Sequence, residues 1–260
     1  MCADAMARIP EDVQRRLLAV IGMTAEQCDA TLQLISLPEN GTTKWTEQYN
    51  YIEALHDGRG YTVTLYGACS GTGDLYQIFQ HVRELDPDHP LVKFMPALKK
   101  CHGDFIDPGA KGLLKAIPAL GADPVWRRAV WRVYIDLYWT FAAHFAAKTG
   151  PCTKRPGPVL ATPLAKGWLV DCALNHGGDM DSFKPILKRM KRPDAADPAA
   201  WLADFMAARH ALLKSGYEDL DTSKTGDRAT MWLQLITQGN VDLKKPIRAY
   251  RGYWGRAMVV

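Results

Sequence analysis

The segment that begins at Asp123-Pro124 carries the longest apolar periodicity in the chain, and it constrains the fold most strongly. An aspartate followed by a proline is typical of a helix start, because proline is tolerated in the first helical turn. Large apolar side chains then recur every three or four residues, which places them on one face of a helix. This face consists of Trp126, Val130, Val133, Leu137 and Phe141. We therefore predict a central buried helix in this region.

Helical patterns also dominate the rest of the chain. A capping box of Thr24 and Gln27 predicts a helix over 25–36 that stops near Pro38. Apolar and aromatic residues at helical spacing predict a second helix over 44–56, which must end at Gly58. Four more helices are predicted at 75–85 with Asp74 as the cap, 163–175 after Thr162, 198–214 and 227–238.

The best strand candidate is "YTVTLYGACS" at 61–70, which alternates and is rich in β-branched and aromatic residues. A doubly wound α/β fold would need strands between most helices, so that class is excluded. The predicted fold class is mainly α with a small β-sheet. A loop rich in proline and glycine at 149–158 is a candidate boundary between two lobes.

The composition excludes several classes of protein. The chain has 260 residues, enough for one large domain or two lobes, and 47% of them are hydrophobic. We find no apolar run long enough to span a bilayer and no signal peptide, so the protein stays inside the cell or the chain begins at a mature or engineered terminus. The six cysteines contain no C-x-x-C pair, which argues against a structural zinc site but leaves one or two disulfides open.

Acidic and aromatic residues are crowded into 37–62, "LPENGTTKWTEQYNYIEALHDGRGYT". Glu39 is expected just after a helix end and Asp57 in a Gly-x-Gly turn, where side chains reach into clefts. The plainer interpretation is that Glu39 is a solvated acid in a loop and that Asp57 helps to form a turn. Thr62 follows closely enough to help hold a water, and Trp45 and the tyrosines offer flat faces for sugar rings. Two acids, a positioned water and aromatic platforms are the ingredients of glycoside hydrolysis.

Residues 45–62 contain the motif W-x-x-x-Y-x-Y-I-E-x-x-x-D-G-R-G-Y-T, and residues 67–74 contain G-x-C-S-G-T-G-D. Together these motifs resemble the signature of the glycoside hydrolase family 46 chitosanases. The 18-residue spacing from Glu39 to Asp57 also matches. Weaker similarity, at "MPALKK", "VWRRAVW", "VDCALNHG", "FMAAR" and "GNVDL", extends it over most of 24–245. The resemblance implies a single catalytic domain over 1–260 with a two-lobed lysozyme-like fold, a central helix and a substrate cleft formed around 37–75.

The resemblance also implies roles for individual residues. Glu39 would be the general acid, Asp57 the general base, and Thr62 would position the attacking water. The residues expected to line the cleft are Tyr51, Glu53, Arg59 and Asp74. An acid bracketed by two arginines would support Glu39; the matching residues are Asp171, Arg209 and Arg228, with Lys224 as the alternative third member.

The implied reaction is endo-hydrolysis of β-1,4 bonds in chitosan with inversion and without a metal or other cofactor. An inverting hydrolase needs carboxyl groups about 6.5–9.5 Å apart, a protonated acid and an ionised base. Residues 36–76 carry five acids against Lys44 and Arg59, whereas the whole chain has a net charge of +4. An acidic stretch in a mildly basic protein suits a cationic polymer. We expect a monomer that acts outside the cell and binds neither nucleic acid nor membranes.

Other candidate sites are weaker. "CSGTGD" lacks the lysine of a phosphate-binding loop, the seven histidines form no His-x-x-x-His pair, and "KPILKRMKRP" at 184–193 is best interpreted as a solvated helix face. Most of the tryptophans at 126, 131, 168, 201 and 232 are expected in the core and not as sugar platforms. Two alternative functions stay open: hydrolysis of another amino-sugar polymer such as peptidoglycan, and non-catalytic polysaccharide binding.

Overall fold

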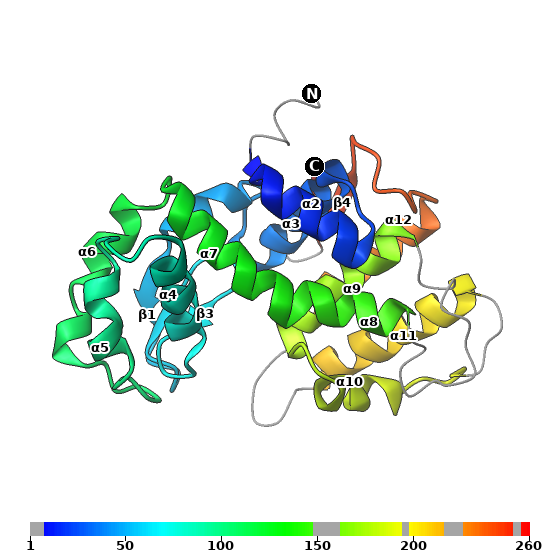
Figure 1. Ribbon diagram of the computed structural model, residues 1–260. Helices are drawn as coiled ribbons and strands as arrows, with labels where there is room; N and C mark the ends of the chain where they lie inside the picture. The colour runs from blue at the N-terminus through cyan, green and yellow to red at the C-terminus, as the bar shows by residue number, and fades with distance from the viewer. Residues whose placement is uncertain (1–7, 148–161, 194–197, 216–225, 252–255) are drawn as a thin grey trace. The chain divides into compact units, whose positions relative to one another are not determined.

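The computed structural model describes residues 8–147, 162–193, 198–215, 226–251 and 256–260 (Figure 1). The chain divides into two compact units: unit 1 contains Ala3–Arg15 and Lys44–Asp136, and unit 2 contains Arg16–Thr43 and Leu137–Val260. The predicted class, mainly α with a small β-sheet, is confirmed. The candidate boundary at 149–158 lies outside the described residues. The chain passes between the units at residues 15, 43 and 136. None of the helices within the described ranges is long and apolar enough to cross a membrane.

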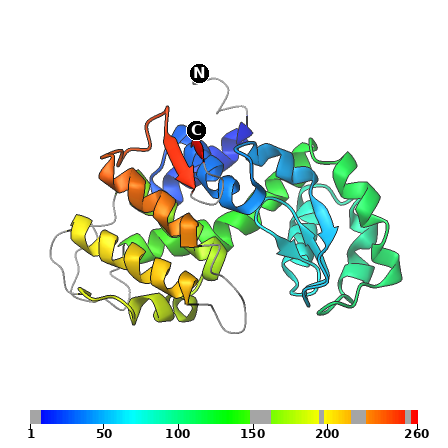
Figure 2. The same cartoon turned by 180° about the vertical axis from the view of Figure 1, so that it is seen from behind.

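Unit 1 combines short helices with a three-stranded antiparallel sheet, drawn in cyan in Figure 2. Its helical elements are η1 (Trp45–Asn50), α4 (Asp74–Leu85), η2 (Val92–Phe94), α5 (Met95–Leu98), η3 (Pro108–Ala110), α6 (Leu113–Ala119) and α7 (Pro124–Tyr134). Its strands are β1 (Ile52–Ala54), β2 (Tyr61–Val63) and β3 (Ala68–Cys69). Helix α2 (Glu11–Ile21) runs from the residues of unit 1 into those of unit 2.

The predicted helix at Asp123-Pro124 forms as α7, and the Asp123 side chain accepts a hydrogen bond from the backbone N–H of Trp126 at 2.8 Å. Helix α7 packs against α4, where the Trp126 ring meets Phe79 edge-on at 6.0 Å. The indole N–H of Trp126 donates to the carbonyl of Tyr49 at 3.1 Å, so this helix also fixes η1. All five tryptophans expected in the core are buried.

The apolar face predicted from Trp126 to Phe141 is only partly correct. A turn of π-helix at Ile135–Trp139 interrupts the helical run before α8 (Thr140–Ala147). A π-turn contains an additional residue, so it rotates the following side chains about the helix axis. As a result Trp139 and Phe145 are buried, whereas Leu137 and Phe141 are only half-buried.

The predicted helix over 44–56 is wrong. Trp45 and Tyr49 are buried one helical turn apart, but η1 ends at Asn50 and β1 follows. Strand β1 pairs with β2 in antiparallel register, with Ile52 opposite Val63. Pairing with a neighbouring strand therefore overrides the helical spacing of this segment.

The predicted strand at 61–70 is two strands. Strands β2 and β3 pair in antiparallel register with Val63 opposite Ala68, and the turn between them contains Thr64 and Gly67 at positive φ. The expectation that Asp74 caps α4 is also wrong. Gly73 occupies the N-cap, and the Asp74 carboxylate accepts a hydrogen bond from the hydroxyl of Thr72 at 3.1 Å instead.

Unit 2 is organised around α9 (Pro163–His176), which confirms the helix predicted over 163–175. Helix α9 is buried on nearly all sides and packs against α3 (Ala25–Asn40), α8, α10 (Met180–Leu187) and α12 (Gly226–Thr237). Helix α11 (Pro198–Lys214) packs against α10 and α12. A helix that is apolar all round must be enclosed by others, and the sequence of α9 meets that condition.

Helix α3 starts as predicted and ends later than predicted. The capping box of Thr24 and Gln27 is present, but the helix continues through Pro38 to Asn40. Gly41 ends it in the left-handed conformation (φ 69°), where its N–H donates to the carbonyl of Leu37 at 3.0 Å. This cap satisfies the carbonyl of Leu37 at the end of the helix. Glu39 therefore lies in the last turn of a helix and not in a loop.

A second sheet was not predicted. Strands β4 (Arg248–Arg251) and β5 (Arg256–Val259) pair in antiparallel register, and β4 also contacts α12. Ile247 and Val260 exchange both backbone hydrogen bonds at 2.9 Å, which extends this pairing to the end of the chain.

The described cysteines carry free thiols, so none of the possible disulfides is formed among them. These are Cys28, Cys69, Cys101 and Cys172, whereas Cys2 and Cys152 lie outside the described residues.

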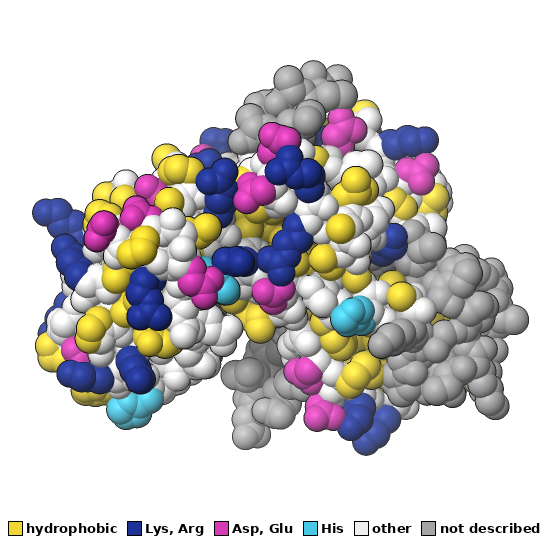
Figure 3. Space-filling model, viewed as in Figure 1, with side chains coloured by type: hydrophobic (Ala, Val, Ile, Leu, Met, Phe, Trp, Pro, Cys, Tyr) yellow, Lys and Arg dark blue, Asp and Glu magenta, His cyan; other side chains and the backbone are white. Residues whose placement is uncertain are grey.

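Acidic and basic side chains are interspersed on the face shown in Figure 3, rather than gathered into a patch of one sign. On unit 1, Arg132 of α7 lies 3.1 Å from Glu84 of α4, and Arg128 lies 3.2 Å from Asp12. Such exposed ion pairs contribute at most about 1 kcal/mol each. The surface charges of this face therefore add little to the stability of unit 1.

Two glycines before α4 give a matched stability test. A Cβ at Gly71 would lie 2.1 Å from the carbonyl oxygen of Gly103, whereas one at Gly73 (φ 94°) would meet nothing within 4 Å. We expect Gly73→Ala to cost about 1–2 kcal/mol through backbone strain alone. Gly71→Ala should cost about 3 kcal/mol or more, because backbone atoms overlap and no rotamer change relieves them. Chemical denaturation of both variants measures the difference, and equal losses would contradict the close packing at Gly71.

Candidate active site

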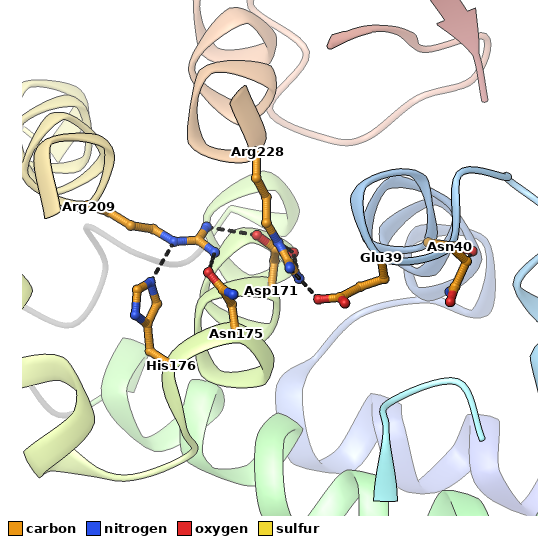
Figure 4. A network of polar contacts seen from close by, with 8 residues as sticks. Glu39, Asn40, Asp171, Asn175, His176, Arg209 and Arg228 are labelled. Carbon is orange, nitrogen blue, oxygen red and sulfur yellow. Dashed lines mark hydrogen bonds and ion pairs between the residues drawn. The ribbon is translucent and has the colours of Figure 1, made fainter. Parts of the chain in front are cut away.

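An acidic side chain with no exposure lies at the centre of unit 2. Asp171 of α9 is fully buried, and each of its carboxylate oxygens accepts a hydrogen bond from an arginine (Figure 4). Arg209 of α11 donates from Nη1 at 2.7 Å, and Arg228 of α12 donates from Nε at 2.7 Å. The three residues predicted as a supporting network therefore meet in the structure. Arg228 occupies the third place, and the alternative, Lys224, lies outside the described residues.

Arg228 connects this buried acid to the candidate general acid. While its Nε binds Asp171, its Nη1 donates to Oε1 of Glu39 in the last turn of α3. Arg228 is almost entirely buried, whereas Glu39 is partly exposed. The guanidinium of Arg228 thus joins the buried Asp171 in the interior of unit 2 to the carboxylate of Glu39 at its surface.

The charges in this network compensate one another. Burial alone would raise the pKa of Asp171, but the two guanidinium groups more than offset this and hold the pKa below its usual range. Burial also opposes the charge on Arg228, yet Asp171 and Glu39 hold its pKa above the ordinary value. Asp171 is therefore ionised and both arginines are charged, as a buried charge requires.

The network extends to two residues that sequence reasoning missed. Arg209 donates from Nη2 to Oδ1 of Asn175 at 3.0 Å and from Nε to Nε2 of His176 at 3.2 Å (Figure 4). Asn175 follows Asp171 by four residues, so helical spacing could have found it, whereas His176 lies one residue further along α9. The guanidinium of Arg209 also lies 5.7 Å from the ring centroid of Trp168, one turn before Asp171. Helix α9 thus contacts Arg209 from four positions: Trp168, Asp171, Asn175 and His176.

His176 must be neutral to accept a hydrogen bond from an arginine. Burial lowers the pKa of His176 to about 3, and the positive charges of Arg209 and Arg228 act in the same direction. A neutral imidazole therefore completes the set of acceptors around Arg209.

The candidate general base lies in unit 1, in the turn between β1 and β2. Oδ1 of Asp57 accepts from the backbone N–H of Arg59 at 3.2 Å, and Oδ2 accepts from Nε and Nη2 of the same arginine at 2.9 and 2.5 Å. These hydrogen bonds hold the pKa of Asp57 below its usual range. The expectation that Asp57 follows a helix is wrong, because the chain before it is the strand β1. The turn is instead the end of a β-hairpin.

The other predicted residues of unit 1 lie on the same sheet or next to it. Thr62 is buried in β2, opposite Glu53 of β1 and Cys69 of β3. Its hydroxyl oxygen lies 3.7 Å from the sulfur of Cys69. The hydroxyl of Tyr51 donates to Oε2 of Glu53 at 2.9 Å, and burial together with this bond raises the pKa of Tyr51 to about 12. Tyr51 and Glu53 therefore act as one hydrogen-bonded pair.

The expectation that the aromatic residues of 37–62 form sugar platforms is wrong for most of them. Trp45, Tyr49 and Tyr61 are buried, and the Trp45 ring meets Trp131 edge-on at 6.1 Å. They build the core of unit 1, because an apolar ring gains more from burial than from exposure. Tyr51 is half-buried and is the aromatic residue of this segment that can still meet a ligand. No group of three His, Cys, Asp or Glu side chains suited to a metal occurs in the described part of the chain.

Comparison with known proteins gives a consistent result. The model of glycosyl hydrolase family 46 matches residues 33–247. A chitosanase of Streptomyces sp. (strain N174) is 30% identical over 228 residues, which cover 85% of this chain and 77% of the relative. A chitosanase of Nocardioides sp. (strain N106) is 31% identical over 240 residues, which cover 89% of this chain and 81% of the relative.

Solved structures of chitosanases share the fold. The native chitosanase of Bacillus subtilis MY002 superposes with a TM-score of 0.75 at 26% identity, over 92% of this chain and 99% of that one. The family 46 chitosanase of Gynuella sunshinyii, solved as a complex with chitotetraose, gives a TM-score of 0.73 at 28% identity, over 92% and 98% of the two chains. The predicted lysozyme-like fold class is thereby confirmed.

The neutral His176 gives the protein a specific dependence on pH. Its pKa is lowered in the fold, so the unfolded chain binds this proton at a higher pH than the folded chain does. The stabilisation is therefore complete above about pH 6.5 and is lost as the pH falls towards 3, by at most about 1.4 kcal/mol per pH unit. Denaturation at several pH values between 6.5 and 4.5 measures this slope.

A variant that accepts the same hydrogen bond without titrating isolates the effect. His176→Gln should reduce the slope, because its amide oxygen can accept from Arg209 at any pH. His102→Gln, which changes an exposed histidine, should keep the slope of the original protein. An unchanged slope in His176→Gln would show that His176 is not the group that titrates.

Proposed function

Since the chain belongs to glycosyl hydrolase family 46 and is a glycoside hydrolase, we propose that it cleaves β-1,4 bonds within chitosan chains with inversion at the anomeric carbon. The relatives that it resembles are chitosanases, and one solved relative is a complex with chitotetraose. The observation that carries the mechanism is the contrast between two carboxylates: Asp57 is held by a neighbouring arginine on an exposed turn, and Glu39 is held by the buried Arg228.

Asp57 suits the role of general base because it is ionised. The low pKa imposed by Arg59 keeps its carboxylate free of protons, as a base that must accept one from water requires. In the proposed reaction Asp57 takes a proton from a water molecule, and the oxygen of that water bonds to the anomeric carbon. The hydroxyl of Thr62 orients this water. Arg59 must give up some of its hydrogen bonds to the carboxylate of Asp57 when the water binds.

Glu39 suits the role of general acid because Asp171 offsets the positive charge of its partner, Arg228. The acid gives its proton to the glycosidic oxygen while the bond from this oxygen to the anomeric carbon breaks. A general acid must hold a proton near the working pH, and two uncompensated arginines nearby would favour its ionised form. Asp171 offsets this positive charge while it fixes the position of Arg228. Asp171, Arg209 and Arg228 thus support the acid without touching the substrate.

The remaining predicted residues are suited to binding a cationic polymer. Chitosan carries ammonium groups, and carboxylates attract and orient such groups. Glu53, paired with the hydroxyl of Tyr51, lies on the strand that precedes the Asp57 turn, and Asp74 starts the helix after β3. We assign these three residues and Arg59 to substrate binding. The proposal treats the whole chain as one catalytic domain.

Two substitutions of the proposed acid and base test this function. Glu39→Gln and Asp57→Asn should each lower kcat on chitosan by about 10²–10⁴-fold, because each removes one proton transfer. Glu47→Gln is the matched control, since Glu47 is an exposed acid of η1 that pairs with Lys44 at 3.3 Å. The release of reducing ends measures the rate, and Glu47→Gln should retain it.

The same assay on three polymers decides the substrate. We expect new reducing ends from chitosan and far fewer from chitin or bacterial cell walls. Activity on cell walls alone would make the protein a hydrolase of another amino-sugar polymer. Binding of chitosan without any hydrolysis would make it a polysaccharide-binding protein. A near-normal kcat of Glu39→Gln would remove Glu39 from the mechanism.

A further inference from the structure

The turn that carries Asp57 is held by a loop that lies far from it in the sequence. This loop, His102–Phe105, follows α5 and closes on itself through two backbone hydrogen bonds between His102 and Phe105, at 3.2 and 2.9 Å. Its single acidic side chain, Asp104, accepts a hydrogen bond from the backbone N–H of Gly58 at 2.9 Å. Gly58 directly follows the proposed base.

A second chain of hydrogen bonds joins the same two segments through the residues before α4. The N–H of Gly71 donates to the carbonyl of Arg59 at 2.9 Å, and the N–H of Gly103 donates to the carbonyl of Gly71 at 3.3 Å. The hydroxyl of Ser70 accepts from the N–H of Tyr61 at 2.9 Å. The turn is thus held at Gly58, Arg59 and Tyr61 by groups outside it.

The Asp57 turn, the residues before α4 and the 102–105 loop approach one another so closely that side chains are excluded between them. A Cβ at Gly71 would lie 2.1 Å from the carbonyl oxygen of Gly103 and 2.8 Å from that of Arg59. A Cβ at Gly60 would lie 3.2 Å from the same oxygen of Gly103 and 2.4 Å from Oγ of Ser70. Backbone atoms therefore pack directly against backbone atoms, and the 102–105 loop is built into the turn.

This contact matters for Asp57 because the turn has little rigidity of its own. Gly58 and Gly60 adopt φ of 85° and 73°, and glycine restricts the backbone less than any other residue. The N–H of Gly58 belongs to the peptide that joins Asp57 to Gly58, so a rotation of this peptide would move the side chain of Asp57. The bond from Gly58 to Asp104 opposes such a rotation.

We infer that Asp104 is a positioning residue for the proposed base: its carboxylate fixes the Gly58 peptide and thereby the place from which Asp57 acts on water. This inference rests on the proposed function, since it assigns Asp104 to the same reaction. Asp104 does not need to touch the sugar. Its loss should therefore lower kcat and leave the affinity for the polymer largely unchanged.

Two substitutions at this position separate the hydrogen bond from the charge. Asp104→Ala removes the acceptor and should lower kcat on chitosan by about 10–100-fold, the loss expected when a catalytic group is misplaced. Asp104→Asn keeps an amide oxygen for the Gly58 N–H and should restore most of that loss. Asp107→Ala is the control: Asp107 is a nearby acid that caps η3 at the N–H of Gly109 and makes no described contact with the turn. It should keep the original kcat.

A measurement that does not depend on catalysis tests the contact itself. Amide hydrogen exchange of Gly58, followed by NMR, should be about tenfold faster in Asp104→Ala than in the original protein. An unchanged Gly58 exchange rate would overturn the proposed contact. An unchanged kcat in Asp104→Ala, or an equal loss in Asp104→Asn, would overturn the positioning role. If the original protein does not hydrolyse chitosan, the proposed function fails, and the exchange rates still decide whether Asp104 fixes the turn.

Discussion

A carboxylate that is buried without any exposure must be balanced by positive charge, and the arrangement of unit 2 follows from this requirement at Asp171. Removing one partner from such a buried pair costs about 3–5 kcal/mol, because the remaining charge is left in the interior. Helices α9, α11 and α12 must therefore meet where Arg209 and Arg228 both reach the same carboxylate. Arg228 also donates from Nη1 to the end of α3, and this hydrogen bond holds Glu39.

Unit 1 holds its acidic residue in a different way. Asp57 lies on an exposed turn with no buried ion pair beneath it, and its position depends on backbone hydrogen bonds and on contacts that only glycine permits. The two carboxylates thus meet their arginines in different surroundings. The exposed Asp57 is kept ionised by Arg59, whereas Glu39 meets an arginine whose charge is already shared with Asp171.

The sequence predicts those features that depend on neighbours in the chain. The capping box at Thr24 and the helix start at Asp123 are set by local hydrogen bonds, and both are confirmed. Features set by distant residues were missed: the strand after η1 needs β2 as its partner. For the site, the family motif named the network residues, and helical spacing from Asp171 could have added Asn175. Asp104 could not be found, because it lies 46 residues from Gly58 and only the fold brings them together.

The central claim is that Asp57 acts through a water molecule while Glu39 protonates the leaving oxygen. A water that attacks from the face opposite the leaving group inverts the anomeric carbon, so a β-linked polymer must yield the α-anomer. NMR of the newly released reducing ends during early turnover of chitosan, before mutarotation, tests this directly. The account predicts that the α-anomer appears first. If the β-anomer appears first, the reaction retains configuration, Asp57 is not a base acting through water, and the proposed mechanism is wrong.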